Sequence, residues 1–317
     1  MPVDPLVRPK FEPLTAAIDD YLLALESERR AAQTLATYGY ALRRFARFAA
    51  GVVPADLTPT TLRAWLTAMA DEGLSPTSRA DYLRACKSWI RWLAAEDAYG
   101  LSERAARACC ERVKPPPQPE EQPDPFTDEE INRLFRACNL HGWMGLRTRA
   151  IVATLLDTGL RASELCGLRI ADVDLVAGEV TVRAVTSKSR RGRTVALGRL
   201  AKREVGHWWA RKRVTWDCAP DAPFFCGRNE RAMTPRTLHR LLTRHGERAG
   251  VADAHPHRFR HTCAINALRA GMSPMAVMRM LGHTDLTMTK RYIKLLDSDV
   301  SEEKRLRSPL DRLRGQL

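Results

Sequence analysis

The chain has 317 residues, of which 44% are hydrophobic and 28% charged, a composition typical of globular proteins with about two domains. This composition excludes intrinsic disorder and fibrous repeats as descriptions of the whole chain. The formal net charge is +14, and a chain this basic usually binds a polyanion. The sequence contains no apolar run of the roughly 18 residues that span a bilayer, and it begins without the apolar segment of a signal peptide. We therefore expect a cytoplasmic protein with no membrane partner.

The positive charge is concentrated in the C-terminal part of the chain. Residues 1–113 carry 15 basic and 14 acidic side chains, whereas residues 126–317 carry 35 and 20. A solvated arginine-rich surface would give the same excess without any partner. The uneven distribution instead favours a polyanion-binding surface in residues 126–317.

Four amphipathic helices are predicted before residue 114. Apolar residues recur at helical spacing in residues 14–29 and 34–49. Two further helices begin at Thr58-Pro59 and Ser75-Pro76, where a capping residue precedes a proline in the first turn. The apolar residues of the first helix include Ile18, Leu22 and Leu23. The buried stripes expected in the last two helices include Leu62 and Trp65, and Leu83 and Trp89. We expect a compact helical bundle over residues 1–113 with no catalytic pattern among its titratable residues.

A proline-rich segment, residues 114–125, separates the two parts of the chain. Its sequence, KPPPQPEEQPDP, disfavours helix and favours an extended spacer. Immediately afterwards, Thr127 and Glu130 have the spacing of a capping box, which marks the start of a helix. We therefore expect a linker followed by a second folded domain over residues 126–317.

Helices dominate the second domain, with one interruption. Residues 179–185 alternate with the period of a strand, and residues 193–197 are also β-prone, so the two segments predict an antiparallel hairpin around a basic tip. Phe224-Phe225 is expected to add a strand or sheet edge. The predicted fold class is mainly α with a small antiparallel β-sheet: an N-terminal helical bundle and a mixed α/β C-terminal domain.

The chemically informative residues of this domain form four groups. In chain order they are Arg161 with Glu164, Lys188 in the hairpin tip, His257 with Arg260 and His261, and His283 followed by Tyr292.

Each group also has an ordinary explanation when taken alone. Arg161 and Glu164 have the i, i+3 spacing of a surface ion pair, and the basic hairpin tip could be a solvated loop. Tyr292 could pack between helices. His257 and His261 have the spacing of a metal-binding helix face, but they lack the glutamate and cysteine partners of zinc motifs. The eight cysteines contain no CxxC pair, so we expect neither a zinc site nor disulfides.

Together and in this order, the four groups resemble the tyrosine recombinase (phage integrase) family, in particular its simple two-domain, Xer-like members. The resemblance extends over the whole chain, because residues 34–45 are similar to the helical core-binding domain of that family. It implies a SAM-like, DNA-binding domain in residues 1–113 and a catalytic domain in residues 126–317, with a tail helix at 301–317.

The resemblance also implies roles for single residues. The implied catalytic set is Arg161, Lys188, His257, Arg260, His283 and the nucleophile Tyr292. Glu164 and His261 match supporting positions, and we expect Arg190, Arg191, Arg193 and Arg258 to contact DNA. The chain departs from the family pattern at Phe259, Ser187, Ser189 and Ala196. These departures concern the hairpin more than the chemistry, because every charge-bearing position is filled.

The residue types suit phosphoryl transfer. Two guanidiniums, of Arg161 and Arg260, can bind the phosphate oxygens as negative charge develops. Tyr292 is the only tyrosine after the linker, and its attack on phosphorus would form a 3′-phosphotyrosyl bond. His257 could assist the phenol, and Lys188 could protonate the leaving 5′-oxygen. We see no carboxylate cluster for Mg²⁺, so we expect no cofactor and no metal nuclease, polymerase or DDE transposase.

The resemblance implies an enzyme of DNA recombination or integration that acts on double-stranded DNA. Such enzymes assemble as tetramers and exchange strands through a four-way junction, alone or with a related recombinase subunit. Residues 301–317 are amphipathic, and the resemblance implies that they dock on a neighbouring subunit, although they could also pack on their own. Two alternatives stay open at this point: a type IB topoisomerase-like relaxase and a non-catalytic, DNA-binding architectural protein.

Overall fold

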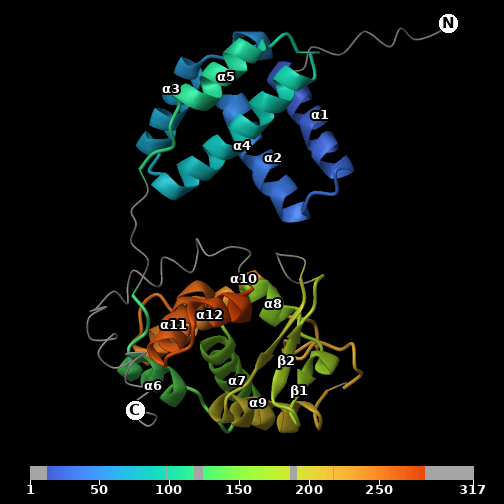
Figure 1. Ribbon diagram of the computed structural model, residues 1–317, viewed down its shortest axis with the longest axis vertical. Coiled ribbons are helices and arrows are strands. Elements are labelled where there is room, and N and C mark those ends of the chain that lie inside the picture. Colours follow the sequence, from blue (N-terminus) through green and yellow to red (C-terminus); the bar gives the residue numbers. More distant parts are fainter. Residues whose placement is uncertain (1–12, 98, 118–123, 186–190, 217, 283–317) are drawn as a thin grey trace, which may run out of the picture. The chain divides into compact units, whose positions relative to one another are not determined.

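The computed structural model describes residues 13–97, 99–117, 124–185, 191–216 and 218–282 (Figure 1). The chain divides into two compact units, Met1–Glu121 and Gln122–Leu317, and the boundary between them falls within the proline-rich segment 114–125. No helix in the described ranges is long and apolar enough to cross a bilayer. All eight cysteines lie in these ranges, and all are free thiols.

The N-terminal unit is a helical bundle. Its elements are α1 (Pro13–Ser27), α2 (Ala32–Phe48), the 3-10 turn η1 (Pro54–Asp56), α3 (Pro59–Asp71), α4 (Pro76–Ala95) and α5 (Glu103–Arg112). The side chains of Thr58 and Ser75 accept hydrogen bonds from the first turns of α3 and α4, as predicted. Phe45 packs edge-on against Trp65 and Trp89, at centroid distances of 5.0 and 6.1 Å. These aromatic contacts join α2, α3 and α4 around one core.

Two features of this unit differ from the prediction. Helix α5 was not expected, because it buries only the small side chains of Ala106 and Cys109 and so lacks a strong apolar stripe. Leu23 is one of the apolar residues of the pattern that predicted this helix, yet it is 65% exposed, since it lies on the face of α1 opposite the buried Ile18 and Leu25.

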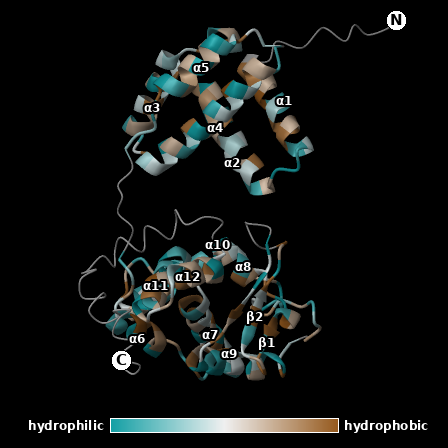
Figure 2. Ribbon diagram, in the orientation of Figure 1, coloured by the Kyte–Doolittle hydropathy of each residue, from teal (hydrophilic) through white to brown (hydrophobic). Residues whose placement is uncertain are grey.

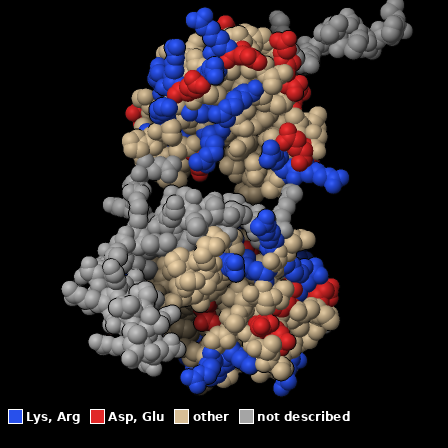
Figure 3. Space-filling view, in the orientation of Figure 1, with Lys and Arg blue, Asp and Glu red and all other residues tan. Residues whose placement is uncertain are grey.

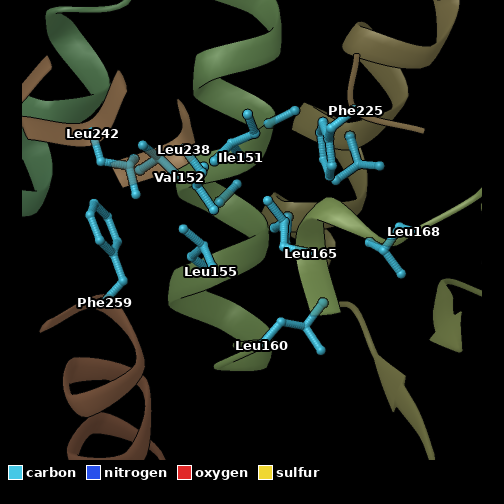
Figure 4. Packing of buried hydrophobic residues seen from close by; sticks show 14 of the residues in the cluster. Ile151, Val152, Leu155, Leu160, Leu165, Leu168, Phe225, Leu238, Leu242 and Phe259 are labelled. Carbon is cyan, nitrogen blue, oxygen red and sulfur yellow. The ribbon is translucent and has the colours of Figure 1, made fainter. Parts of the chain in front are cut away.

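The C-terminal unit surrounds a central helix. Its helices are α6 (Asp128–Arg136), α7 (Trp143–Thr158), α8 (Ala162–Cys166), the 3-10 turn η2 (Ile170–Asp172), α9 (Arg199–Lys212), α10 (Pro235–Ala249), α11 (Pro256–Arg269) and α12 (Pro274–Leu281). Figure 4 shows Ile151, Val152 and Leu155 of α7 in the middle of the buried cluster, with Leu238 to one side and Phe225 to the other. Because α7 is buried on several sides, the position of its C-terminal end is well defined. The residues that follow it, from Gly159 onward, are held in place by that end.

The sheet of this unit is antiparallel, with the order β1-β2-β3. Strand β1 is Val173–Asp174, β2 is Glu179–Val182 and β3 is Arg193–Ala196. The pairing of β2 with β3 confirms the predicted hairpin, whereas β1 is too short to show a period in the sequence. Phe224 and Phe225 are buried core residues between two isolated bridges, formed by Pro223 and Cys226, and they add no strand to this sheet.

Hydrophobic and hydrophilic residues are mixed along the helices of both units (Figure 2), as expected for helices with one buried face. On the face shown in Figure 3, basic and acidic side chains are interspersed on each unit. The capping box predicted at the start of the second unit is present. Glu130 accepts from the Thr127 N–H at 2.9 Å, and the Thr127 hydroxyl accepts from the Glu130 N–H at 3.2 Å.

Candidate active site

Arg161 stands at the junction of α7 and α8. Helix α7 ends at Gly159, which has a φ of 61°, a left-handed conformation that favours glycine. The backbone N–H and the Nη1 of Arg161 both donate to the carboxylate of Glu164, at 2.9 and 3.0 Å. The side chain of Arg161 is 26% exposed, whereas that of Glu164 is fully buried. The predicted pair is therefore formed around a buried carboxylate and not on the surface.

A second arginine binds the same carboxylate. Arg193, in β3, donates from Nη1 and Nη2 to the two oxygens of Glu164, at 3.0 and 2.8 Å. Burial favours the neutral acid, but the hydrogen bonds from Arg193 and Arg161 and their positive charges outweigh this effect and lower the pKa of Glu164. Glu164 is thus held as a carboxylate between two guanidiniums.

Arg260 lies in the first turns of α11 and is 4% exposed. Its Nη1 donates to the carbonyl of Gly159 at 2.6 Å, and its Nη2 donates to the carbonyl of Leu281 at 2.8 Å. Arg260 therefore joins the end of α7, which leads into Arg161, to the end of α12.

Three arginines meet at the C-terminal end of α12. Arg193 Nε donates to Met280 O at 2.7 Å, and Arg161 Nη2 donates to Gly282 O at 3.3 Å. With the bond from Arg260 to Leu281, three consecutive carbonyls each accept from one guanidinium. The last carbonyls of a helix lack intrahelical partners and carry partial negative charge, so cations are stabilised there. The result is a cluster of positive charge beside the segment that leads to His283.

His257 and His261 lie in α11, and His255 stands directly before this helix. His255 caps α11, and its ring stacks on that of His239 with an interplanar angle of 9°. Desolvation and the neighbouring Arg260 lower the pKa of His257. His261 is 2% exposed, and burial together with His257 lowers its pKa. Both rings therefore favour the neutral form near pH 7, in which a ring nitrogen can accept a proton.

Arg258 occupies a different environment from the one predicted for a DNA contact. Its Nη2 donates to both carboxylate oxygens of Glu130, at 3.1 and 2.9 Å, and its guanidinium lies 4.1 Å from the ring centroid of Phe126. It also donates to the carbonyls of Asp124 and Ala252. These contacts tie the start of the C-terminal unit to α11, and they argue against the predicted contact of Arg258 with DNA.

Arg193 likewise faces the protein, since its side chain is 10% exposed. Its inward direction could have been predicted from the strand period, because Arg193 lies two residues before the buried Val195 and so on the same face. Arg191, by contrast, is exposed and stays available as a predicted DNA contact. Lys188, Arg190, His283, Tyr292 and the tail 301–317 lie outside the described residues.

No group of three or more histidine, cysteine, aspartate or glutamate side chains within the described ranges is arranged to hold a metal ion. What the described residues bring together is cationic: Arg161, Arg193 and Arg260, with His257 in the same helix as Arg260. Such a cluster can bind an oxyanion, such as a planar carboxylate or a tetrahedral phosphate.

Comparison with known proteins identifies the family. A model of the phage integrase family matches residues 125–299, and a model of its N-terminal SAM-like domain matches residues 18–97. The chain belongs to the phage integrase family. The fold and family predicted from the sequence are thereby confirmed, and with them the prediction of a tyrosine-type site-specific DNA recombinase.

The similar proteins include recombinases from bacteria and archaea. The tyrosine recombinase XerC 1 of Ralstonia nicotianae is 32% identical over 88% of this chain and 88% of its own length. The tyrosine recombinase XerA of Pyrococcus furiosus is 27% identical over 94% of this chain and 96% of its own. Both similarities therefore extend across the two units.

Solved structures show the same fold. The integrase of transposon Tn1549, in complex with a circular intermediate DNA, matches with a TM-score of 0.73 at 18% identity, over 89% of this chain and 95% of that one. A lambda integrase from a tetramer bound to a Holliday junction matches with a TM-score of 0.69 at 18% identity, over 88% and 76%. At this identity the likeness concerns the fold alone.

Proposed function

We propose that this recombinase cuts and rejoins DNA through a 3′-phosphotyrosyl intermediate on Tyr292. The observation that carries the proposal is the convergence of Arg161 and Arg260 on the C-terminal end of α12. Arg161 comes from the junction of α7 and α8 and Arg260 from α11, and the segment that they contact is followed in sequence by His283. Arg161, Arg260 and His283 are the residues that the family pattern places in one site, and here the two arginines meet at the segment that precedes His283. A simple surface ion pair between Arg161 and Glu164 would not require such a meeting.

Arg161 and Arg260 bind the scissile phosphate. A guanidinium stays charged at any physiological pH and offers donors that match the oxygens of a phosphodiester. The pentacoordinate transition state carries more negative charge than the ground state, so fixed cations stabilise it selectively. Arg161 is the more exposed of the two, and its bond to Gly282 O, at 3.3 Å, is the longest in the cluster. A phosphate oxygen replaces this carbonyl as the partner of Arg161 when DNA binds.

Tyr292 supplies the nucleophilic oxygen. A bond forms between this oxygen and phosphorus while the bond from phosphorus to the 5′-oxygen breaks. The phenol proton passes to His257, whose lowered pKa leaves it neutral and able to accept. Lys188 protonates the departing 5′-oxygen, and His283 donates a hydrogen bond to a phosphate oxygen. Attack by the 5′-hydroxyl of another strand reverses these steps and completes the exchange.

Duplex DNA is bound mainly by the basic C-terminal unit, with Arg190 and Arg191 of the hairpin among its contacts. Four copies assemble on two DNA sites in the cytoplasm, and residues 301–317 of each copy dock on a neighbour. The tetrameric lambda integrase on a Holliday junction supports this assembly by analogy, as does the amphipathic pattern of the tail. A related recombinase could supply some of the subunits.

The test begins with covalent trapping of the protein on genomic fragments, followed by sequencing of the trapped DNA. A supercoiled plasmid that carries two copies of the recovered site is then incubated with the protein. The proposal predicts recombined products. Relaxation without recombination would indicate a topoisomerase, and a mobility shift without a covalent adduct would indicate an architectural DNA-binding protein.

A further inference from the structure

We propose that Arg193 is a positioning residue for strand cleavage: it fixes Glu164 and the C-terminal turn of α12, and both of these bind Arg161. The inference rests on the proposed function, because it assigns Arg161 to the reaction. It replaces the prediction from sequence that Arg193 contacts DNA. The evidence lies in the three sets of contacts that the guanidinium makes.

The first two sets of contacts are hydrogen bonds, which together use all three nitrogens of the guanidinium. Nη1 and Nη2 bind the fully buried carboxylate of Glu164, at 3.0 and 2.8 Å. Nε binds the carbonyl of Met280 at 2.7 Å. Arg193 thus links the carboxylate that holds Arg161 to the last turn of α12 in a single planar group. A lysine in its place could not make all three bonds, because its ammonium lacks the fixed fork of donors.

The third contact is with the residue directly before His283. Gly282 has a φ of 67°, and a Cβ at this position would lie 2.8 Å from Arg193 Nη1 and 3.1 Å from its Cζ. The guanidinium therefore packs against the backbone of Gly282 and leaves no space for a side chain. This close approach fixes the turn through which the chain leaves α12.

Among the described residues, helix α12 has few buried apolar contacts. It has eight residues, and its buried apolar contacts come from a small cluster of Val277 and Leu281 with Ala264 and Ile265 of α11. A helix this short gains most of its order from tertiary contacts. The arginine contacts at its C-terminal end are therefore a large share of what determines its position. Because displacement of a catalytic group by about 1 Å can cost about 100-fold in rate, Arg193 should control the rate of cleavage.

The test compares Arg193→Gln and Arg193→Lys with the wild type. The matched control is Arg211→Gln, because Arg211 is an exposed arginine of α9. Single-turnover cleavage is measured at saturating DNA, and the Kd for DNA and its salt dependence are measured separately. We expect Arg193→Gln to slow cleavage about 100-fold, with a Kd within about twofold of wild type and an unchanged salt slope. Arg193→Lys should recover part of the rate, and Arg211→Gln should cleave normally.

A double-mutant cycle shows whether Arg193 acts through Arg161. In an Arg161→Ala background, Arg193→Gln should slow cleavage by less than about threefold. If the two substitutions slow cleavage independently, so that the double variant shows the product of the single effects, the inference is overturned. A raised Kd for DNA together with a salt slope lowered by about 1 would also overturn it. If Arg193→Gln does not fold, Arg193→Lys decides: a folded variant with the wild-type rate overturns the inference. A wild-type protein that forms no covalent adduct would instead contradict the proposed function.

Discussion

Arg161 donates to Glu164 from both its backbone and its guanidinium, at 2.9 and 3.0 Å, and the carboxylate that receives these bonds has no exposed surface. The spacing of these residues in the sequence is that of a surface ion pair. In the structure, the same spacing closes the turn between α7 and α8, and the Nη2 of Arg161 reaches the carbonyl of Gly282 at the end of α12.

Glu164→Ala should therefore destabilise the protein by about 3 to 5 kcal/mol, because it leaves the guanidiniums of Arg161 and Arg193 without their buried partner. Glu164→Gln should cost less, since it keeps an acceptor. Urea unfolding measures both, with the exposed Glu247→Ala as control. A loss for Glu164→Ala no larger than that of the control would show that the buried carboxylate contributes nothing.

The contribution of Glu164 to stability should also depend on pH. Its pKa is lower in the folded protein than the value of about 4.3 in an unfolded chain. The stabilisation is therefore fully present above that value and is lost as the pH falls through the folded pKa. The stability difference between wild type and Glu164→Gln should stay constant from pH 7 to about 5 and shrink below it. A difference that grew on acidification would contradict this sign.

Arg191 and Arg258 should separate DNA binding from stability. Arg191 is exposed on the hairpin, so Arg191→Ala should raise the Kd for DNA and lower the salt slope by about 1. Arg258 is paired with Glu130 inside the protein, so Arg258→Ala should lower the unfolding temperature and leave the salt slope unchanged. Filter binding at several salt concentrations and thermal melting give the two readouts. The reverse pattern would restore Arg258 as a DNA contact.

The two units should differ in their affinity for DNA. Each has its own buried core, so residues 1–113 and 126–317 can be prepared as separate fragments. The second fragment carries the excess of basic residues and should bind duplex DNA with a steep salt dependence, whereas the first should bind much more weakly. Equal salt slopes for the two fragments would contradict the charge argument.

Lys188 should behave as the general acid. Lys188→Ala should slow cleavage of normal DNA but cut a substrate with a 5′-bridging phosphorothiolate at nearly the wild-type rate, because sulfur leaves without protonation. Single-turnover cleavage of the two substrates provides the comparison, and Arg190→Ala and Arg191→Ala serve as controls from the same hairpin. A rescued defect in one of these arginine variants, with normal cleavage by Lys188→Ala, would move the role to that arginine.

Local signals in the sequence predicted much of the fold. The caps at Thr58, Ser75 and Thr127, and the strand alternation of the hairpin, depend on neighbours within a few residues, and all of them are present in the structure. Helix α5 escaped prediction because its buried residues are small. Residue type and spacing therefore predict caps, turns and strongly amphipathic elements, but not a helix whose burial depends on tertiary contacts of small side chains.

The candidate site was harder to predict where it depends on long-range contacts. Sequence order was enough to nominate Arg161 and Arg260, but not their contacts with the end of α12, since the carbonyls of Gly282 and Leu281 that accept from them lie 121 and 21 residues further along the chain, respectively. Arg193 and Arg258 were predicted as DNA contacts from their charge alone. Their partners in the structure, the fully buried Glu164 and the partly buried Glu130, argue against that interpretation.

The central claim, a phosphotyrosyl intermediate on Tyr292, is tested most directly by the covalent adduct itself. Wild type and Tyr292→Phe are incubated with a suicide substrate, denatured and digested, and the peptides are analysed by mass spectrometry. For the wild type, the account predicts a nucleotide linked through its 3′-phosphate to the peptide containing Tyr292. For Tyr292→Phe it predicts no adduct, although this variant should still fold and bind DNA because it loses only one oxygen. An adduct on another residue, or an undiminished adduct in the phenylalanine variant, would contradict the account.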